Sequence, residues 1–226
     1  MRIMLKLSGE VLGGPQGIGL DADTLKQFAH ILGTIAQKHE LAIVTGGGNI
    51  LRGKSTKGID RSKADQIGMM ATVINCMTLE QHLLAQGFKA HAVSSVRSLA
   101  TPYDIPEARK ALSEGTIILV AGGTSNPYFT TDSAAALRAL ELNCDILIKA
   151  TKVDGVYDKD PTKHPDARRY EHISLQDAID QKLGVMDLTA MILCRENGMK
   201  LRVCCVDMLH DLDAILSDNS KSTLVD

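Results

Sequence analysis

Three glycine-containing segments, each directly after an apolar run, are the residues in this sequence best suited to chemistry. They are Lys6–Gly9, Gly46–Asn49 and Gly122–Asn126. Glycine lets backbone N–H groups approach an anion closely, and helix N-termini add a favourable dipole. One glycine after a strand is equally well explained by a tight turn. Three such ends, one of them a glycine triplet, favour phosphate binding.

The apolar runs alternate with segments of helical periodicity through most of the chain. Continuous apolar runs predict strands at 3–7, 41–45, 90–93, 116–120, 146–150 and 201–206. Apolar residues spaced three and four apart predict helices at about 20–36, 62–86, 106–115, 132–142, 175–181 and 187–197. These units predict one α/β domain over residues 1–226, with a mainly parallel sheet covered by helices on both faces. Ligands bind such sheets at the carboxyl ends of the strands, where the glycine segments lie.

One segment interrupts the alternation of strands and helices. The pair Asp154–Gly155 lies between β-forming residues and predicts a hairpin within Val153–Tyr157. The polar stretch Asp158–Arg169 behind it contains two prolines and is not expected to pack in the core. We therefore expect a hairpin insertion near 153–170.

A second motif offers a competing interpretation of the phosphate site. Gly48–Ser55 satisfies the pattern GxxxxGK[ST] after a predicted strand, and in a P-loop Lys54 would reach the β- and γ-phosphates. A P-loop leads directly into a helix, however. The following residues, Ser55–Asp60, contain a glycine and almost no apolar side chains. The context favours the three glycine ends, and the P-loop is kept as the alternative.

The composition excludes several classes of protein. The chain has 226 residues, 44% hydrophobic and 23% charged, which is the balance of a globular protein rather than a disordered or collagen-like one. A net charge of -2 and 3% aromatic residues argue against a partner that is a nucleic-acid polymer. No segment approaches about 18 uninterrupted apolar residues, so no membrane span is expected.

The cysteines and histidines point to a reducing compartment and to no directly bound metal. The five cysteines are an odd number without zinc-site spacing, and most lie among apolar residues, as buried thiols do. The seven histidines show no ligand spacing such as HxxxH. The start of the chain, Met1–Lys6, does not read as a signal peptide. We therefore expect a cytoplasmic location.

The glycine segments belong to a longer series of motifs. In chain order the series is Lys6–Gly9, Gly46–Asn49 with Arg52, Asp65–Met69, Asn126–Ala135, Lys149–Tyr157 and Val185–Asp187. Across nearly the whole chain it resembles the bacterial uridylate kinases of the amino-acid kinase superfamily. The resemblance implies the family's three-layer αβα sandwich, of the carbamate kinase-like type. It also implies transfer of the γ-phosphoryl group of ATP to UMP with nucleotide-bound Mg²⁺.

The resemblance further implies roles for individual residues. Lys6 would bridge the phosphates, Arg52 would be a second phosphate clamp, and Asp132 would orient Lys6 or hold Mg²⁺ through water. The structural alternatives are a lysine that merely flanks a strand and an aspartate that caps a helix. The residues implied to bind UMP are Gly47, Asp65, Thr124, Ser125, Asn126, Pro127, Tyr128, Phe129, Thr130 and Thr131. The residues implied to bind ATP are Lys6, Leu7, Ser8, Gly9, Gly48, Arg52, Thr151, Tyr157 and Asp160.

The resemblance also carries expectations about the halves of the chain, regulation and assembly. The N-terminal part would face UMP and the part from about residue 120 would face ATP, with the hairpin as a nucleotide lid. A homohexamer is expected, with GTP and UTP as possible effectors. The segment matching an effector site in some relatives comprises Gly14, Pro15, Gln16, Gly17, Ile18 and Gly19, and its structural alternative is a loop. Asp60 stands where some relatives carry a neutral Asn, which leaves the effector response open.

Two further hypotheses about function remain at this point. The chain could phosphorylate a different acceptor on the same fold. It could also be a non-catalytic nucleotide-binding or storage protein of this superfamily, whose sequence mark would be the loss of Lys6 or Asp132. Both of these residues are present.

Overall fold

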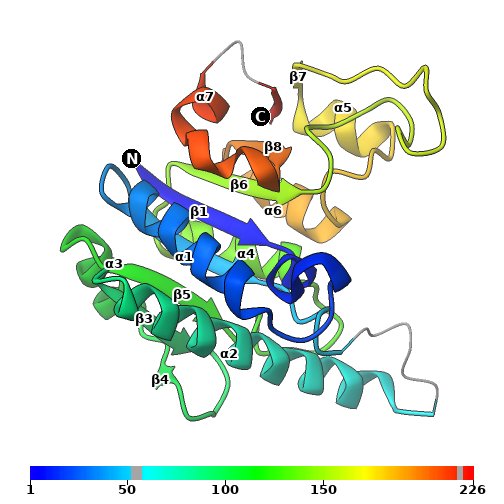
Figure 1. The fold of residues 1–226 in the computed structure, drawn as a ribbon. Helices are drawn as coiled ribbons and strands as arrows, with labels where there is room; N and C mark the ends of the chain where they lie inside the picture. Colours follow the sequence, from blue (N-terminus) through cyan, green and yellow to red (C-terminus); the bar gives the residue numbers. More distant parts are fainter. Residues whose placement is uncertain (52–57, 218–220) are drawn as a thin grey trace.

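A nine-stranded sheet forms the centre of the described molecule (Figure 1). The computed structural model describes residues 1–51, 58–217 and 221–226. Within these residues the strand order is β4-β3-β5-β2-β1-β6-β8-β9-β7. The strands are β1 (Arg2–Leu7), β2 (Glu40–Thr45), β3 (Ala90–Ser94), β4 (Thr101–Pro102), β5 (Ile117–Ala121), β6 (Ile146–Thr151), β7 (His172–Ile173), β8 (Leu201–Cys205) and β9 (Ser222–Val225).

Helices cover the two faces of this sheet (Figure 1). One face packs against α1 (Ala22–Ala36), α2 (Arg61–Ala85) and α7 (Leu212–Leu216), with the 3-10 helices η1 (Gly9–Gln16) and η3 (Val206–Asp211). The other face packs against α3 (Ile105–Ser113), α4 (Thr131–Glu141), α5 (Leu175–Asp180) and α6 (Leu188–Glu196). Each face buries its own apolar cluster. The predicted three-layer αβα sandwich is confirmed.

Strand alternation determines which face each side chain of β1 and β6 reaches. Successive side chains of a strand point to opposite faces. In β1, Leu5 packs on the α1 and α2 side, whereas Met4 packs on the α4 side. Lys6, two residues after Met4, therefore emerges toward α4. Lys149 of β6 is its parallel register partner and emerges on the same face.

The mainly parallel sheet is confirmed, and the antiparallel pairing among the described strands lies near one edge. Strand β9 pairs antiparallel with β8, and the two-residue strands β4 and β7 occupy the outer positions. None of these three short strands was expected from the apolar runs. A strand of two to four residues is too short to show a periodicity of its own.

The hairpin predicted at Asp154–Gly155 is wrong. Tyr157 instead forms an antiparallel bridge with Arg169, which closes a wider loop over residues 158–168. Gly155 is needed for close packing, because a Cβ there would lie 2.5 Å from Thr223 Oγ1. The backbone N–H of Val156 donates to the same hydroxyl at 2.8 Å. The glycine therefore serves a close approach to β9 and not a two-residue turn.

The cysteines and the helices bear on two expectations that were drawn from the composition. All five cysteines are free, four of them buried and Cys205 partly so, as the interpretation of buried thiols predicts. In the described part of the chain, no helix combines the length and apolar character that crossing a bilayer requires.

Candidate active site

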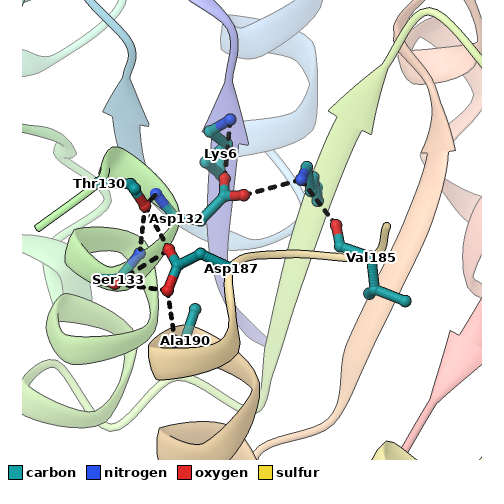
Figure 2. A network of polar contacts seen from close by, with 8 residues as sticks. Lys6, Thr130, Asp132, Ser133, Val185, Asp187 and Ala190 are labelled. Carbon is teal, nitrogen blue, oxygen red and sulfur yellow. Dashed lines mark hydrogen bonds and ion pairs between the residues drawn. The ribbon is translucent and has the colours of Figure 1, made fainter. Parts of the chain in front are cut away.

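Two lysines and one aspartate form a buried ion cluster at the carboxyl ends of β1 and β6. Lys6 Nζ lies 2.8 Å from Asp132 Oδ1, and Lys149 Nζ lies 2.8 Å from Asp132 Oδ2. Lys149 also donates to the carbonyl oxygen of Val185 at 2.6 Å. All three charged side chains are at most 15% exposed. Figure 2 shows Asp132 at the start of its helix, turned toward Lys6 on β1.

The electrostatics of this cluster favour an incoming anion. Burial alone would raise the pKa of Asp132, but the ammonium groups of Lys6 and Lys149 outweigh it and hold that pKa below its usual value. Burial lowers the pKa of Lys149, and the opposing attraction of Asp132 only partly offsets this effect. With all three groups ionised, they sum to one positive charge in a region of low dielectric, and the Asp187 carboxylate near Lys149 offsets part of it. Such a charge stabilises negative oxygens more strongly than it would in water.

The start of α4 is held by residues other than Asp132. The N-cap is Thr130, whose hydroxyl accepts from the backbone N–H groups of Asp132 and Ser133 at 3.0 and 3.2 Å. The structural alternative of Asp132 as an N-cap is therefore wrong. Its carboxylate is left for the two lysines.

Asp187 ties the start of α4 to the start of α6. Its carboxylate accepts from Ser133 Oγ at 2.9 and 3.0 Å and from the Thr130 hydroxyl. It also caps α6 by accepting from Ala190 N at 3.0 Å (Figure 2). The helix that presents Asp132 is thereby fixed at its first turn.

A cavity of about 150 Å³ lies beside the ion cluster. Six of the residues predicted to contact UMP line it: Gly47, Asp65, Thr124, Phe129, Thr130 and Thr131. Gly48 and Gly123 line it as well, so two of the three glycine segments meet here. The third lies close by, because a Cβ on Gly9 would be only 2.3 Å from Gly46 O. Ser125, Asn126, Pro127 and Tyr128 belong to the same loop but are not among the lining residues.

Asp65 joins α2 to that loop. Its Oδ2 accepts from the backbone N–H of Tyr128 at 2.8 Å, and Arg61 Nε lies 3.8 Å away. The Arg61 guanidinium also lies 5.2 Å from the centre of the Tyr128 ring, within reach of a cation–π contact. Tyr128 has φ of 73°, a left-handed conformation that is unusual for a non-glycine residue. These contacts hold the loop over the cavity rim.

A second cavity, of about 370 Å³, is lined by the segment that follows β6. It is lined by two of the residues predicted to contact ATP, Tyr157 and Asp160, together with the segment 181–184. That segment leads directly to Val185, whose carbonyl binds Lys149. Thr151 ends β6, and its hydroxyl donates to Val153 O at 2.8 Å. The ion cluster is therefore connected to both cavities along the chain, through Thr131 to the first and through Val185 to the second.

The remaining residues singled out from the sequence lie at the end of β1, around η1, at the start of α2 or outside the described residues. Leu7, Ser8 and Gly9 lie at the end of β1 and the start of η1, beside Gly46. The segment 14–19 is mostly within or next to η1, and 14–17 lines a separate cavity of about 400 Å³. Arg52 and Lys54 lie outside the described residues. Asp60 is the N-cap of α2, accepting from Lys63 N at 3.2 Å, a role that Asn fills equally well.

Several residues of the site have no role that is predicted from the sequence. The position of Lys149 could have been predicted, because strand alternation places it beside Lys6 once β1 and β6 are paired. That of Thr72 could not, since its role depends on α2 approaching β5: its hydroxyl accepts from Gly122 N at 2.9 Å. Asp187 is found in the sequence only as the last residue of the motif Val185–Asp187, without a role of its own.

The site offers little for a metal held directly by protein. Among residues 1–51, 58–217 and 221–226, no three His, Cys, Asp or Glu side chains gather in a ligand arrangement. Both carboxylate oxygens of Asp132 are engaged by ammonium groups. Each carboxylate oxygen of Asp132 thus already has a cationic partner within the protein.

A αβα sandwich with glycine turns and a cationic cluster at its strand ends is one of the architectures used for phosphoryl transfer. Comparison with known proteins agrees, since the model of the amino acid kinase family matches residues 1–205. The chain belongs to the amino acid kinase family.

Within that family the chain is similar to proteins described as uridylate kinases or UMP kinases. The chain is 47% identical over 207 residues to the uridylate kinase of Methylococcus capsulatus, covering 89% of this chain and 87% of that one. It is 43% identical to the uridylate kinase of Magnetococcus marinus, over 100% and 95% of the two chains. The crystal structure of the UMP kinase from Ureaplasma parvum superposes with a TM-score of 0.93 at 37% identity, over 100% and 98%. The UMP kinase of Bacillus anthracis gives 0.92 at 31%, over 100% and 95%. The predicted family resemblance is confirmed.

Proposed function

We propose that this protein is a UMP kinase, which transfers the γ-phosphoryl group of ATP to UMP and yields ADP and UDP. The observation that carries the proposal is the buried cluster of Lys6, Asp132 and Lys149, in which two ammonium groups meet one carboxylate and which adjoins segments that line two cavities. The full-length similarity to uridylate kinases supports the choice of UMP as the acceptor.

The chemistry of this transfer suits a site without a general base. A phosphate oxygen of UMP is already an anion and attacks the γ-phosphorus of ATP. The bond from that phosphorus to the β–γ bridging oxygen breaks, and ADP leaves with the electron pair. The protein has to align two mutually repelling phosphates and stabilise the charge on the transferred group. Lys6 supplies that charge at the end of β1, and Asp132 orients it.

The first cavity suits the acceptor nucleotide. Gly47 would face the UMP phosphate with its backbone N–H, and Asp65 would accept hydrogen bonds from the ribose hydroxyls. The loop Thr124–Thr131 would read the edge of the pyrimidine with backbone and hydroxyl groups. Phe129 and the apolar wall of α2 would exclude water from the base. The N-terminal half of the sheet is thus the acceptor side of the single domain.

The second cavity suits the donor nucleotide. Tyr157 and Asp160 would contact the adenosine part of ATP, with Thr151 at the end of β6. Ser8, Gly9 and Gly48 would cradle the phosphates between the two cavities, and Arg52 would be a further phosphate clamp. Mg²⁺ would enter bound to the ATP phosphates, where it neutralises charge on the oxygens. Lys6 and Lys149 complement that charge from the protein side.

Assembly, regulation and location follow the family resemblance. We propose a homohexamer in the cytoplasm, with GTP and UTP as possible effectors and the segment 14–19 as a candidate effector site. Its cavity contains acidic and basic side chains, Glu10 and Lys152, which lie 3.4 Å apart. The free, buried thiols are those expected in a reducing compartment.

A coupled ADP-release assay tests the proposed function. The purified protein is given MgATP with UMP, CMP, carbamate, N-acetylglutamate or aspartate in parallel. We expect UMP to give the highest kcat/KM by a wide margin. Turnover with another acceptor and not with UMP would assign a different kinase reaction. No turnover by well-folded protein that binds ATP would favour a nucleotide-binding role, although the intact Lys6–Asp132 pair argues against it.

A further inference from the structure

A reciprocal pair of buried asparagines lies directly behind the glycine triplet. Asn49 Nδ2 donates to Asn75 Oδ1 at 2.9 Å, and Asn75 Nδ2 donates to Asn49 Oδ1 at 2.8 Å. Their remaining amide N–H groups are also used. Asn75 donates to Gly46 O at 2.7 Å, and Asn49 donates to Gly19 O at 2.7 Å. Asn75 is 0% exposed and Asn49 is 3% exposed.

The bond to Gly46 O fixes the direction of the next N–H group. The peptide between Gly46 and Gly47 is trans and planar, so its C=O and N–H point in opposite directions. With the carbonyl held against Asn75, the N–H of Gly47 points away from the buried amide pair. Gly47 lines the acceptor cavity, and no residue in the described part of the chain accepts a hydrogen bond from this N–H. The geometry leaves it available to an anion.

The same pair positions the other glycine turns. A Cβ on Gly9 would lie 2.3 Å from Gly46 O and 2.5 Å from Asn49 Oδ1, so the first turn packs against the carbonyl and amide that the pair holds. Gly19 is bound in both directions, since its N–H donates to Asn49 O at 2.8 Å. Two side chains therefore connect the ends of β1 and β2, helix α2 and the segment after η1.

Burying two amides is costly unless every donor and acceptor is satisfied, and a pair of leucines would fill similar space with no such requirement. Here all four amide N–H groups have partners, and two of them hold backbone carbonyls at the glycine turns. We propose that Asn49 and Asn75 are positioning residues, which hold the Gly46–Gly47 peptide so that its N–H faces the acceptor phosphate. This inference rests on the proposed function for the identity of that phosphate.

The variant Asn75→Leu tests the proposal, because it keeps the volume and removes the donors. Its binding of UMP and of uridine is measured by calorimetry beside the parent protein. We expect the Kd of UMP to rise by roughly tenfold, since one oriented donor to an anion is lost. The Kd of uridine, which has no phosphate, should stay within about twofold. Val73→Ala, a buried change on the same helix, is the control and should not separate the two ligands.

Two outcomes would overturn the proposal. Equal weakening of UMP and uridine would mean that Asn75 only supports the fold, and unchanged UMP binding would mean that the peptide needs no such support. If the leucine variant does not fold, Asn75→Ser replaces it, because its hydroxyl is too short to make the amide contacts. The Kd values of UMP and uridine for this variant are interpreted in the same way. If the parent protein does not phosphorylate UMP, the proposed function fails. The inference is then judged by the Kd of inorganic phosphate, which should be higher for Asn75→Leu than for the parent protein if the Gly47 N–H faces an anion.

Discussion

The ion cluster and the rim of the first cavity both contain a cationic and an acidic side chain, but these differ in exposure and in distance. In the cluster, Lys6 and Asp132 are 12% and 14% exposed and their charged atoms are 2.8 Å apart. At the rim, Arg61 is 69% exposed and lies 3.8 Å from Asp65. Charges interact strongly where water is excluded and weakly where it is not.

This contrast indicates that the cluster and the rim have different roles in the proposed reaction. In the proposed function, the buried cluster supplies positive charge at the point where phosphoryl transfer needs it. We propose that the exposed rim makes weak contacts, which let a nucleotide enter and leave. Substitutions in the cluster should therefore affect kcat most, and those at the rim should affect KM by smaller factors.

The largest effect is expected from Lys6→Ala. It removes the charge closest to the end of β1 and should lower kcat by about a thousandfold, the upper range for loss of one stabilising donor. Steady-state ADP release measures it. Lys54→Ala is the matched control and should stay near parental activity. The opposite pattern, with Lys54 essential and Lys6 dispensable, would establish the P-loop interpretation.

Lys149→Met should have the next largest effect. Without Lys149, Asp132 neutralises Lys6 and the cluster loses its net positive charge, so kcat should fall by roughly a hundredfold with little change in the KM of UMP. Lys149→Arg should recover part of the activity. In an Asp132→Asn background the same lysine change should cost less. Additive losses in the double variant would show that the two residues act independently.

The low pKa of Asp132 makes its stabilising effect depend on pH. A carboxyl whose pKa is lower in the folded state stabilises the fold fully above its unfolded pKa of about 4, and that contribution is lost as pH falls through the lower folded value. The difference in unfolding free energy between the parent protein and Asp132→Asn should thus shrink between about pH 5 and pH 2. Urea unfolding at several pH values measures it. A difference that is constant with pH would contradict the account.

Asp65→Asn should act on the acceptor and not on the transfer step. The variant keeps the shape and loses the charge that we propose accepts from ribose hydroxyls, so the KM of UMP should rise by about tenfold with a small change in kcat. The KM of ATP serves as the internal control. Discrimination between UMP and 2′-deoxy-UMP should decrease. An equal loss for both acceptors would remove Asp65 from ribose recognition.

The smallest effect is expected from Arg61→Met. Its ion pair with Asp65 is long and exposed, so only the contact with the Tyr128 ring is of consequence. The KM of UMP should rise by about twofold to threefold. The neighbouring Lys63→Met, which changes an exposed charge on the same helix turn, should leave it unchanged. A tenfold effect of Arg61 would mean that the rim contributes as much as the Asp65 carboxylate.

Much of the fold and part of the site could be predicted from the sequence. The strands at the centre are mainly apolar runs, most clearly β5, and Thr130 and Asp132 lie in a recognisable helix start. The edge strands β4, β7 and β9 are too short to carry a pattern. The Asp154–Gly155 pair resembles a turn signal although Gly155 serves packing against β9. Local sequence does not distinguish these two uses of glycine.

The ion cluster shows a second limit of prediction from the sequence. Lys6 and Lys149 are far apart in the chain, and only the pairing of β1 with β6 makes them neighbours. Asn75 lies on a long helix, where nothing in its own surroundings in the sequence predicts a bond to Gly46. Contacts between side chains of distant elements follow from tertiary packing, which periodicity does not encode.

A crystal structure of the protein with UMP bound tests the central claim most directly. The account predicts the ribose hydroxyls against Asp65, the pyrimidine against the loop Thr124–Thr131 and the phosphate facing Gly47 N–H, with Lys6 beyond it toward the donor side. UMP bound elsewhere, or in this cavity with its phosphate turned away from the glycine turns, would contradict it.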